Sequence, residues 1–255
     1  MRKRNRKDAE TTGISKERAF DISAWTPKTD IGRKIKAGEI TNIDMILDAG
    51  KRIMEPEIVD ALLKGLQVDL LEIGQSKGKF GGGKRTIWKT TQKKSKEGNK
   101  PSFTAMAVVG NKDGYLGIGM GKSKETMPAR EKATKQAKLN IIKIKRGCGS
   151  WQCNCREPHS LPFAVSGKNG SSQLRIMPAP KGTGLCMAGE ARKMLALAGV
   201  KDVYSRTKGQ TVTRVNLLIA CFKALKELSK VKVMPEYVAK AGIVSGRKEN
   251  KEVTQ

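Results

Sequence analysis

Hydrophobic positions at helical spacing follow a polar, charged start to the chain. The residues that carry this spacing are Ile35, Ile40, Ile43, Ile46 and Leu47. Such recurrence indicates short amphipathic helices. Pro56 suits the first turn of a further helix, because the fixed φ of proline fits that position. Residues 1–67 are therefore expected to form a basic arm followed by a helical extension.

An alternating pattern begins near Val68 and predicts strands. Residues 68–73 indicate a strand that enters a hairpin, and residues 103–109 and 115–120 indicate two more. The last two are separated by Gly110, Asn111, Lys112, Asp113 and Gly114, and asparagine, aspartate and glycine tolerate the positive φ of a tight turn. The pattern predicts an antiparallel pair.

A helix is expected next, over residues 124–141. Ala129, Ala133 and Ala137 fall on one of its faces, whereas Lys124, Lys135 and Lys138 fall on roughly the opposite face. The alanine face can pack closely on a sheet while the lysines meet solvent or phosphate. Residues 68–145 are thus expected to be one small domain.

A second small domain is expected over residues 161–230. Its predicted strands are 161–166, 173–177 and 203–204, the first two joined at residues 167–170. Its predicted helices are 186–198, ending at Gly199, and 213–228. A linker rich in glycine and cysteine, 146–160, precedes it, and a mostly polar tail, 231–255, follows it. The fold class is α+β, with two small domains and a helical N-terminal extension.

Charge narrows the range of partners. The 255 residues include 51 Lys and Arg against 24 Asp and Glu, a net charge of +27. A chain so charged repels itself when compact and needs a polyanion, of which nucleic acid is the commonest. An anionic membrane surface is the rival partner. No apolar run of transmembrane length and no signal peptide is found, so we expect a cytoplasmic protein that does not bind membranes.

The basic residues expected to bind RNA lie in an insert, on the second strand pair and on the helix after it. The insert, 77–100, holds nine Lys or Arg and one acid. The candidates are Lys77, Lys79, Lys84, Arg85, Lys122, Lys124, Lys135, Lys138, Lys143, Lys145 and Arg146. Merely solvated faces are the alternative. Aromatic residues make up only 4% of the chain, which favours recognition of folded RNA through shape and phosphates over base stacking.

Gly117, Gly119 and Gly121, followed by Lys122, invite comparison with a nucleotide-binding loop. A phosphate-binding loop would require glycine at position 116, which is Leu116. Glycines in a strand also allow another backbone to approach closely. Beside Lys122 we expect that backbone to be RNA, and we count the three glycines among the RNA-binding candidates.

Four cysteine and histidine side chains crowd into the linker. Cys148, Cys153, Cys155 and His159 are ligand types that zinc prefers, although their spacing is not that of a standard zinc finger. They either form a structural zinc site or remain unligated. Four protein ligands would leave no open position for catalysis. Five cysteines, an odd number, indicate a reducing compartment and argue against a disulfide framework.

Catalytic chemistry is not expected. His159 is the only histidine, and we find no phosphate-binding loop, carboxylate cluster or histidine pair of the kind a nuclease or NTPase needs. Cys186 and Cys221 are expected to be small core residues, not nucleophiles. The chain is therefore predicted not to be an enzyme and to need no organic cofactor.

Three segments resemble small-subunit ribosomal protein five. Residues 108–122 read VVGNKDGYLGIGMGK and residues 178–185 read PAPKGTGL, and both are similar to that family. Residues 25–29, WTPKT, resemble its archaeal and eukaryotic branch, and the cysteine-rich linker resembles archaeal members. The insert 77–100 departs from the family in being longer and more basic.

The resemblance implies more than the residues do by themselves. It implies a double-stranded-RNA-binding-like first domain and a βαβ-type second domain. It also implies a structural role in the small ribosomal subunit, with small-subunit rRNA, ribosomal proteins four and eight and mRNA near its entry path as partners. Support of mRNA entry and of decoding accuracy in translation would follow.

Overall fold

The computed structural model describes residues 22, 24–75, 83 and 85–247. The helices of this part are α1 (Asp30–Lys36), α2 (Asp44–Asp48), α3 (Pro56–Leu62), α4 (Thr126–Leu139), α5 (Gly189–Ala198), α6 (Arg214–Lys230) and α7 (Pro235–Ala241). The longer strands are β1 (Gln67–Leu71), β4 (Lys89–Ser95), β5 (Gly98–Gly110), β6 (Tyr115–Ser123), β9 (Val165–Asn169), β10 (Ser172–Pro178) and β12 (Val203–Lys208). The short strands are β2 (Gly74–Gln75), β3 (Arg85–Thr86), β7 (Ile141–Lys143), β8 (Lys145–Arg146), β11 (Leu185–Cys186) and β13 (Val244–Ser245).

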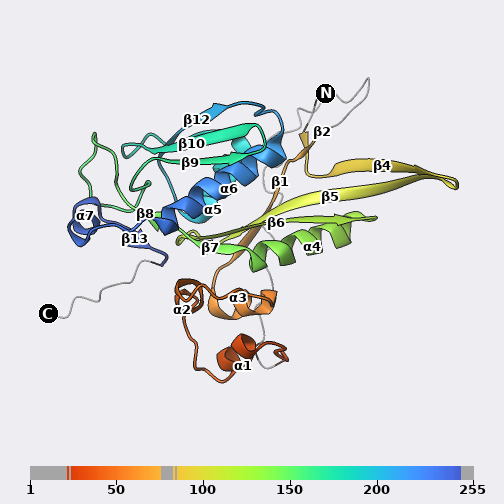
Figure 1. The fold of residues 1–255 in the computed structure, drawn as a ribbon, viewed down its shortest axis with the longest axis horizontal. Helices are drawn as coiled ribbons and strands as arrows, with labels where there is room; N and C mark the ends of the chain where they lie inside the picture. The colour runs from red at the N-terminus through yellow and green to blue at the C-terminus, as the bar shows by residue number, and fades with distance from the viewer. Residues whose placement is uncertain (1–21, 23, 76–82, 84, 248–255) are drawn as a thin grey trace, which may run out of the picture.

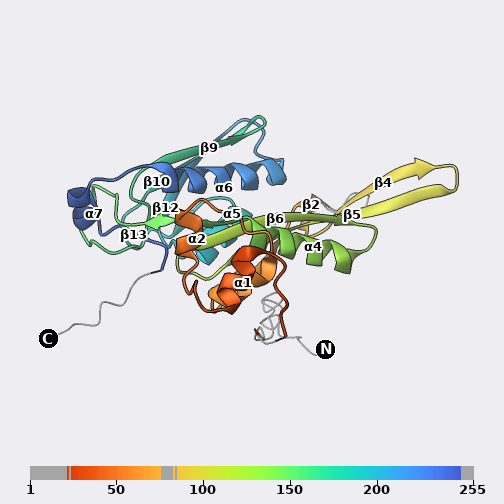
Figure 2. The same ribbon diagram turned by 60° about the horizontal axis from the view of Figure 1, so that its bottom comes forward.

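An antiparallel sheet with the order β1-β5-β6-β7 forms the centre of the molecule (Figure 1). The turn predicted at residues 110–114 is confirmed, with positive φ at Lys112 and Gly114. The strand expected at 103–109 is longer, because β5 begins at Gly98 and pairs with β4. Together β4 and the first part of β5 project as a two-stranded arm, residues 89–104 (Figures 1 and 2).

Helix α4 lies directly on one face of this sheet. Ala105 and Ala107 of β5 are opposite Gly121 and Gly119 of β6, and these positions face the buried alanines of α4. A Cβ added at Gly119 would lie 2.2 Å from the backbone nitrogen of Ala137. Because the glycines have no side chain and the alanines have only a methyl group, the backbones of the helix and the strand come into contact. This is the close packing expected from the alanine face of the predicted helix.

The other face of the sheet packs on the C-terminal half of the chain. Met106, Val108, Leu116 and Ile118 alternate with the small residues along β5 and β6, so they point the opposite way. They belong to one buried cluster with residues of α5 and α6, including Leu195. The two units expected from the sequence thus share a hydrophobic core.

The C-terminal unit contains a second sheet, in the order β11-β12-β10-β9. Strands β11 and β12 are parallel and are connected through α5, whereas the other pairs are antiparallel. Gly199 ends α5 with φ 79°, as predicted. The first strand was predicted too early, because it begins at Val165, and its hairpin turns at residues 170–171 instead of 167–170. The helix predicted from residue 186 begins at Gly189, because residues 185–186 are β11.

The two ends of the described chain fold back onto this body. Helices α1 to α3 bury their apolar residues in a cluster that includes Tyr115 and Ile141 of the sheet. The Tyr115 hydroxyl donates a hydrogen bond to Asp44 of α2 at 2.9 Å, and burial raises its pKa. At the other end, the segment expected as a polar tail contains α7, and its β13 pairs with β8. Among the described residues, no helix has the length and apolarity needed to cross a membrane.

Adding one methyl group at Gly119 should destabilise the protein. In Gly119→Ala the new Cβ meets the backbone of Ala133 and Ala137, so the free energy of unfolding should fall by about 1–3 kcal/mol. Gly189→Ala is the control, because an added Cβ at Gly189 meets nothing within 4 Å. Urea unfolding followed by circular dichroism measures both. Equal stability of the two variants would contradict close packing of α4 on β6.

Candidate nucleic-acid interface and metal centre

Three of the predicted RNA-binding lysines are exposed on β6, on α4 or between them. Lys122 and Lys124 lie at the end of β6 and in the connection that follows, and Lys135 lies on the outer face of α4. Arg85 in β3 is partly exposed. The predicted contacts Lys77, Lys79 and Lys84 lie outside the described residues.

Lys138 does not lie on the exposed face of α4 where the helical spacing placed it. Its ammonium is 2.9 Å from a carboxylate oxygen of Asp60 in α3, and its side chain is only 9% exposed. The expectation is wrong because α3 covers this part of α4. Lys138 is a structural cation whose buried charge Asp60 compensates.

Lys143 and Arg146 also use their charges in contacts within the protein. Lys143 forms ion pairs with Asp44 and Asp48 of α2, at 3.2 and 3.3 Å. The buried guanidinium of Arg146 donates hydrogen bonds to the carbonyl oxygens of Lys112, Gly199 and Gly246, and burial lowers its pKa. It therefore ties together the turn after β5, the end of α5 and the segment after β13.

Lys145 is a partly exposed neighbour of these two. Its ammonium donates to the carbonyl oxygen of Val231 at 2.7 Å, near the end of α6. A second, longer bond goes to the carbonyl oxygen of Ser229 at 3.5 Å. The two bonds use two of its three donors, so Lys145 remains able to contact a phosphate with the third.

The glycines of β6 pack against helix α4 and are not open to RNA. A Cβ on Gly117 would lie 2.1 Å from the carbonyl oxygen of Ala137, and one on Gly121 would lie 2.2 Å from that of Ala129. Gly117, Gly119 and Gly121 are buried. The close approach inferred from the sequence is present, but its partner is intramolecular.

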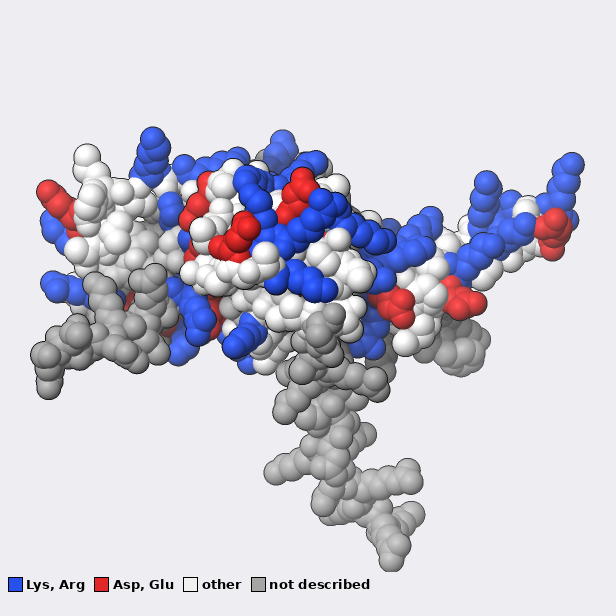
Figure 3. Space-filling view, turned by 90° about the horizontal axis from the view of Figure 1, so that it is seen from below, with Lys and Arg blue, Asp and Glu red and all other residues white. Residues whose placement is uncertain are grey.

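The arm formed by β4 and β5 carries further cations that were expected only as part of a basic insert. Its exposed lysines are Lys89, Lys93, Lys94, Lys96 and Lys100. Glu97 at its tip pairs with Lys100 at 2.5 Å. Figure 3 shows the arm projecting at the right, with blue side chains along it and few red ones.

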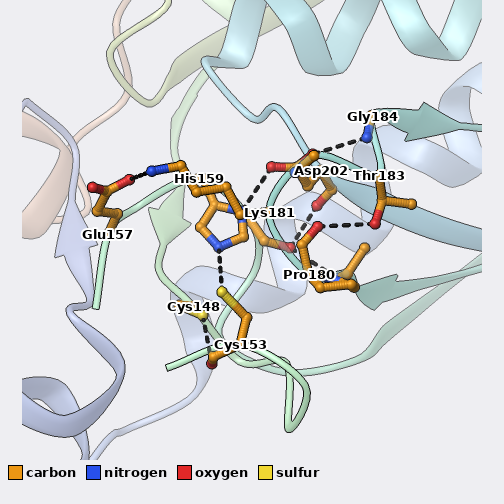
Figure 4. Close-up of polar contacts among 12 residues, drawn as sticks. Cys148, Cys153, Glu157, His159, Pro180, Lys181, Thr183, Gly184 and Asp202 are labelled. Carbon is orange, nitrogen blue, oxygen red and sulfur yellow. Dashed lines mark hydrogen bonds and ion pairs between the residues drawn. The ribbon is translucent and has the colours of Figure 1, made fainter. Parts of the chain in front are cut away.

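The four side chains proposed from the sequence as metal ligands do converge. The ligand atoms of Cys148, Cys153, Cys155 and His159 all lie within 4.8 Å of one another. Tetrahedral zinc would place such atoms about 3.5–4 Å apart. The Cys153 sulfur is 3.9 Å from Nε2 of His159 (Figure 4), so small side-chain movements would complete the site.

Asp202 orients the histidine, a contact that no local pattern in the sequence indicates. Its carboxylate oxygen lies 2.8 Å from Nδ1 of His159, and both side chains are buried. Because a carboxylate accepts, Nδ1–H donates and the lone pair of Nε2 faces the thiols. The other carboxylate oxygen accepts from the backbone of Gly182 and Gly184, at 3.1 and 2.8 Å. A carboxylate behind a ligand histidine is the usual support of a zinc site.

The thiols differ in their environments. The backbone N–H of Lys181 and the neighbouring Cys155 lower the pKa of Cys153 to about 6. Burial raises the pKa of Cys148 to about 11. Cys221 is buried in the core as expected, whereas Cys186 is exposed, which corrects its expected place in the core. Only the linker thiols belong to a cluster of potential ligands in the described chain.

Comparison with known proteins covers most of the chain. Residues 87–145 match the family described as Ribosomal protein S5, N-terminal domain, and residues 167–241 match Ribosomal protein S5, C-terminal domain. A relative from Nanoarchaeum equitans, named small ribosomal subunit protein uS5, is 48% identical over 91% of this chain and 99% of its own length. Relatives of the same name are 48% identical in Methanocaldococcus jannaschii (89% and 98% covered) and 47% identical in Pyrobaculum calidifontis (81% and 95%).

Arg146 should prove necessary for stability. Arg146→Met leaves three carbonyl oxygens without their donor, so the free energy of unfolding should fall by about 2–4 kcal/mol. Lys135→Met removes the same charge from an exposed position and should change it by less than about 0.5 kcal/mol. Chemical unfolding measures the difference. If Arg146→Met leaves the free energy of unfolding unchanged, Arg146 has no structural role and becomes a candidate RNA contact again.

Proposed function

The chain belongs to the ribosomal protein S5 family, and on that premise we propose how its surface serves the small ribosomal subunit. It is a structural constituent of that subunit in translation, and it is not an enzyme. Its work is positional, since it binds ribosomal RNA and neighbouring ribosomal proteins. The finer roles below are our proposals.

We propose that Lys122, Lys124 and Lys135 bind phosphates of small-subunit rRNA, and that Arg85 and Lys145 make further phosphate contacts elsewhere on the protein. The exposure of the three lysines on a rigid support carries the proposal, because the Gly–Ala packing of α4 on β6 fixes their positions. We propose Lys77, Lys79 and Lys84, which lie outside the described residues, as further phosphate contacts. Sheet and α4 together would act as a double-stranded-RNA-binding-like unit that reads shape and phosphates.

The second unit would meet protein neighbours. Its β11–α5–β12 crossover supports the βαβ-type description, and Val212 and Tyr204 expose apolar surface, 62% and 39% respectively. The family resemblance supports ribosomal proteins four and eight as these neighbours. It also supports a place near the mRNA entry path, an influence on decoding accuracy, and a cytoplasmic location.

We further propose a structural zinc ion held by Cys148, Cys153, Cys155 and His159. The convergence of their ligand atoms and the orientation of His159 by Asp202 support it. The ion would supply cross-links within the linker and no reaction, because all four positions would be taken by protein. It would fix the linker where α7 packs, since the Cys148 amide donates to the carbonyl oxygen of Ala241 at 2.8 Å.

Removing two proposed phosphate contacts should weaken the salt dependence of RNA binding. For Lys122→Ala with Lys124→Ala, the slope of log affinity against log salt should fall by about two. Filter binding to full-length small-subunit rRNA across a salt series measures it. The control removes two exposed lysines of α6, Lys226 and Lys230, which lie outside the proposed contacts. An unchanged slope in the first variant would refute the proposal that Lys122 and Lys124 bind phosphate.

Zinc should be present at one equivalent and should depend on the linker thiols. Cys153→Ser should lose the metal and lower the melting temperature, because the ion's binding energy contributes to folding. Cys186 is an exposed cysteine outside the cluster, so Cys186→Ser should keep both the zinc and the melting temperature of the wild type. Elemental analysis and thermal unfolding with and without chelator test this. Metal-free protein whose melting is the same in Cys153→Ser would exclude a structural zinc.

A further inference from the structure

The lysines of the arm are divided unequally between its two faces. Strand pairing places Lys89 opposite Thr104, and Lys93 opposite Lys100, so these four share one face. The other face carries Lys94 opposite Asn99, with Gln92 opposite Pro101 and Thr90 opposite Phe103. One face thus has three strand lysines and the other has one.

The lysine face continues without a break into the central sheet. Thr104 pairs on its other side with Lys122 of β6, so Lys89, Thr104 and Lys122 form one row across three strands. Further out, Thr91 and Ser102 form the next row, their hydroxyls 2.9 Å apart, and Lys93 and Lys100 form the third. Rows lie about 7 Å apart, two residues along a strand. We call these seven residues the lysine ladder.

A hollow of about 280 Å³ lies at the inner end of the lysine ladder. Lys89, Thr104 and Lys122 line it, and Met120 and Val215 of α6 give it an apolar floor. Met120 is 49% exposed, although its neighbour across the strands, Met106, is buried. The hollow is near the lower limit of about 300 Å³ for small-ligand sites, so we assign to it no more than one nucleotide.

Lysines placed directly opposite each other lower the stability of a strand pair. Lys93 and Lys100 are such a pair, and in the described part of the chain only Lys100 forms an ion pair, with Glu97. A polyanion along this face would remove the repulsion, and serine and threonine hydroxyls between lysines suit the phosphate and sugar oxygens of RNA. A protein partner would need a row of carboxylates in the same spacing, so RNA is the simpler complement.

We propose that the lysine ladder binds the sugar–phosphate backbone of one RNA segment, and that the hollow receives a single unpaired nucleotide from it. The inference rests on the proposed binding of small-subunit rRNA and adds the face of the arm that is used. The opposite face, which carries Lys94, makes no such contact. Figures 1 and 2 show the arm reaching well beyond the body of the protein, where such a segment can lie along it.

Two adjacent lysines of equal charge test the claim. Lys93→Gln should lower the salt slope of binding to full-length small-subunit rRNA by about one, whereas Lys94→Gln should leave it nearly unchanged. Equal reductions would overturn the one-faced arm, because general attraction does not distinguish the faces. A wild-type protein that fails to bind this RNA would instead count against the proposed function itself.

Two adjacent threonines identify the partner. A photo-crosslinking residue in place of Thr91, on the lysine ladder, should join to rRNA in small subunits that contain the protein. The same residue in place of Thr90 should not. Cross-links from position 91 to a protein, or equal RNA cross-links from both positions, would overturn the proposal.

The hollow has its own test. Val215→Trp fills its floor from α6 without removing a charge. One unpaired nucleotide near the position 91 cross-link should be protected from a base-modifying reagent by the wild type and become reactive in this variant. Melting temperature checks that the variant is folded. If the folded variant protects the nucleotide as well as the wild type does, the nucleotide does not lie in the hollow.

Discussion

The direct contact between the backbones of α4 and β6 is the constraint on which the rest of the structure depends. Glycines at alternate positions of β6 and alanines on one face of α4 leave nothing larger than a methyl group between them. Large apolar residues at the intervening positions must then point to the other face, where they join the core of the C-terminal unit. The sheet is consequently covered on both sides, and its cations emerge only at its end and along the arm.

This arrangement divides the basic residues into two groups with different tasks. Lys138, Lys143 and Arg146 lie inside, where carboxylates or carbonyl oxygens compensate for the loss of water. Lys122, Lys124, Lys135 and the lysines of the arm remain outside and account for a surface that attracts phosphate. The internal cations hold the N-terminal extension, the linker and the tail against the sheet, and so keep the external ones in place.

Local signals predicted much of this fold. The alanine face of α4, the turn at 110–114, Pro56 at the start of α3 and Gly199 after α5 are visible in short windows because each has a local physical cause. The cysteine cluster is likewise local. Asp60 and Asp202, however, act 78 and 43 residues away from Lys138 and His159, and no spacing rule connects them.

The errors have the same origin. Periodicity placed Lys138 on an outer face because it describes one helix and cannot include α3 above it. The glycines of β6 correctly indicated a close approach, but which backbone approaches is a tertiary fact. The arm was not recognised as a pair of strands because its residues, KTTQKKS in β4 and GNKPSFT at the start of β5, are almost all polar. No hydrophobic period exists where neither face of a strand pair is buried.

Sedimentation of a native lysate tests the central claim most directly, namely that the protein is an integral component which its basic surface holds on small-subunit rRNA. The protein should migrate with small subunits in a sucrose gradient, remain there at moderate salt, and leave only as higher salt screens its phosphate contacts. A free pool, or release at low salt, would contradict the account and indicate a loosely bound RNA factor instead.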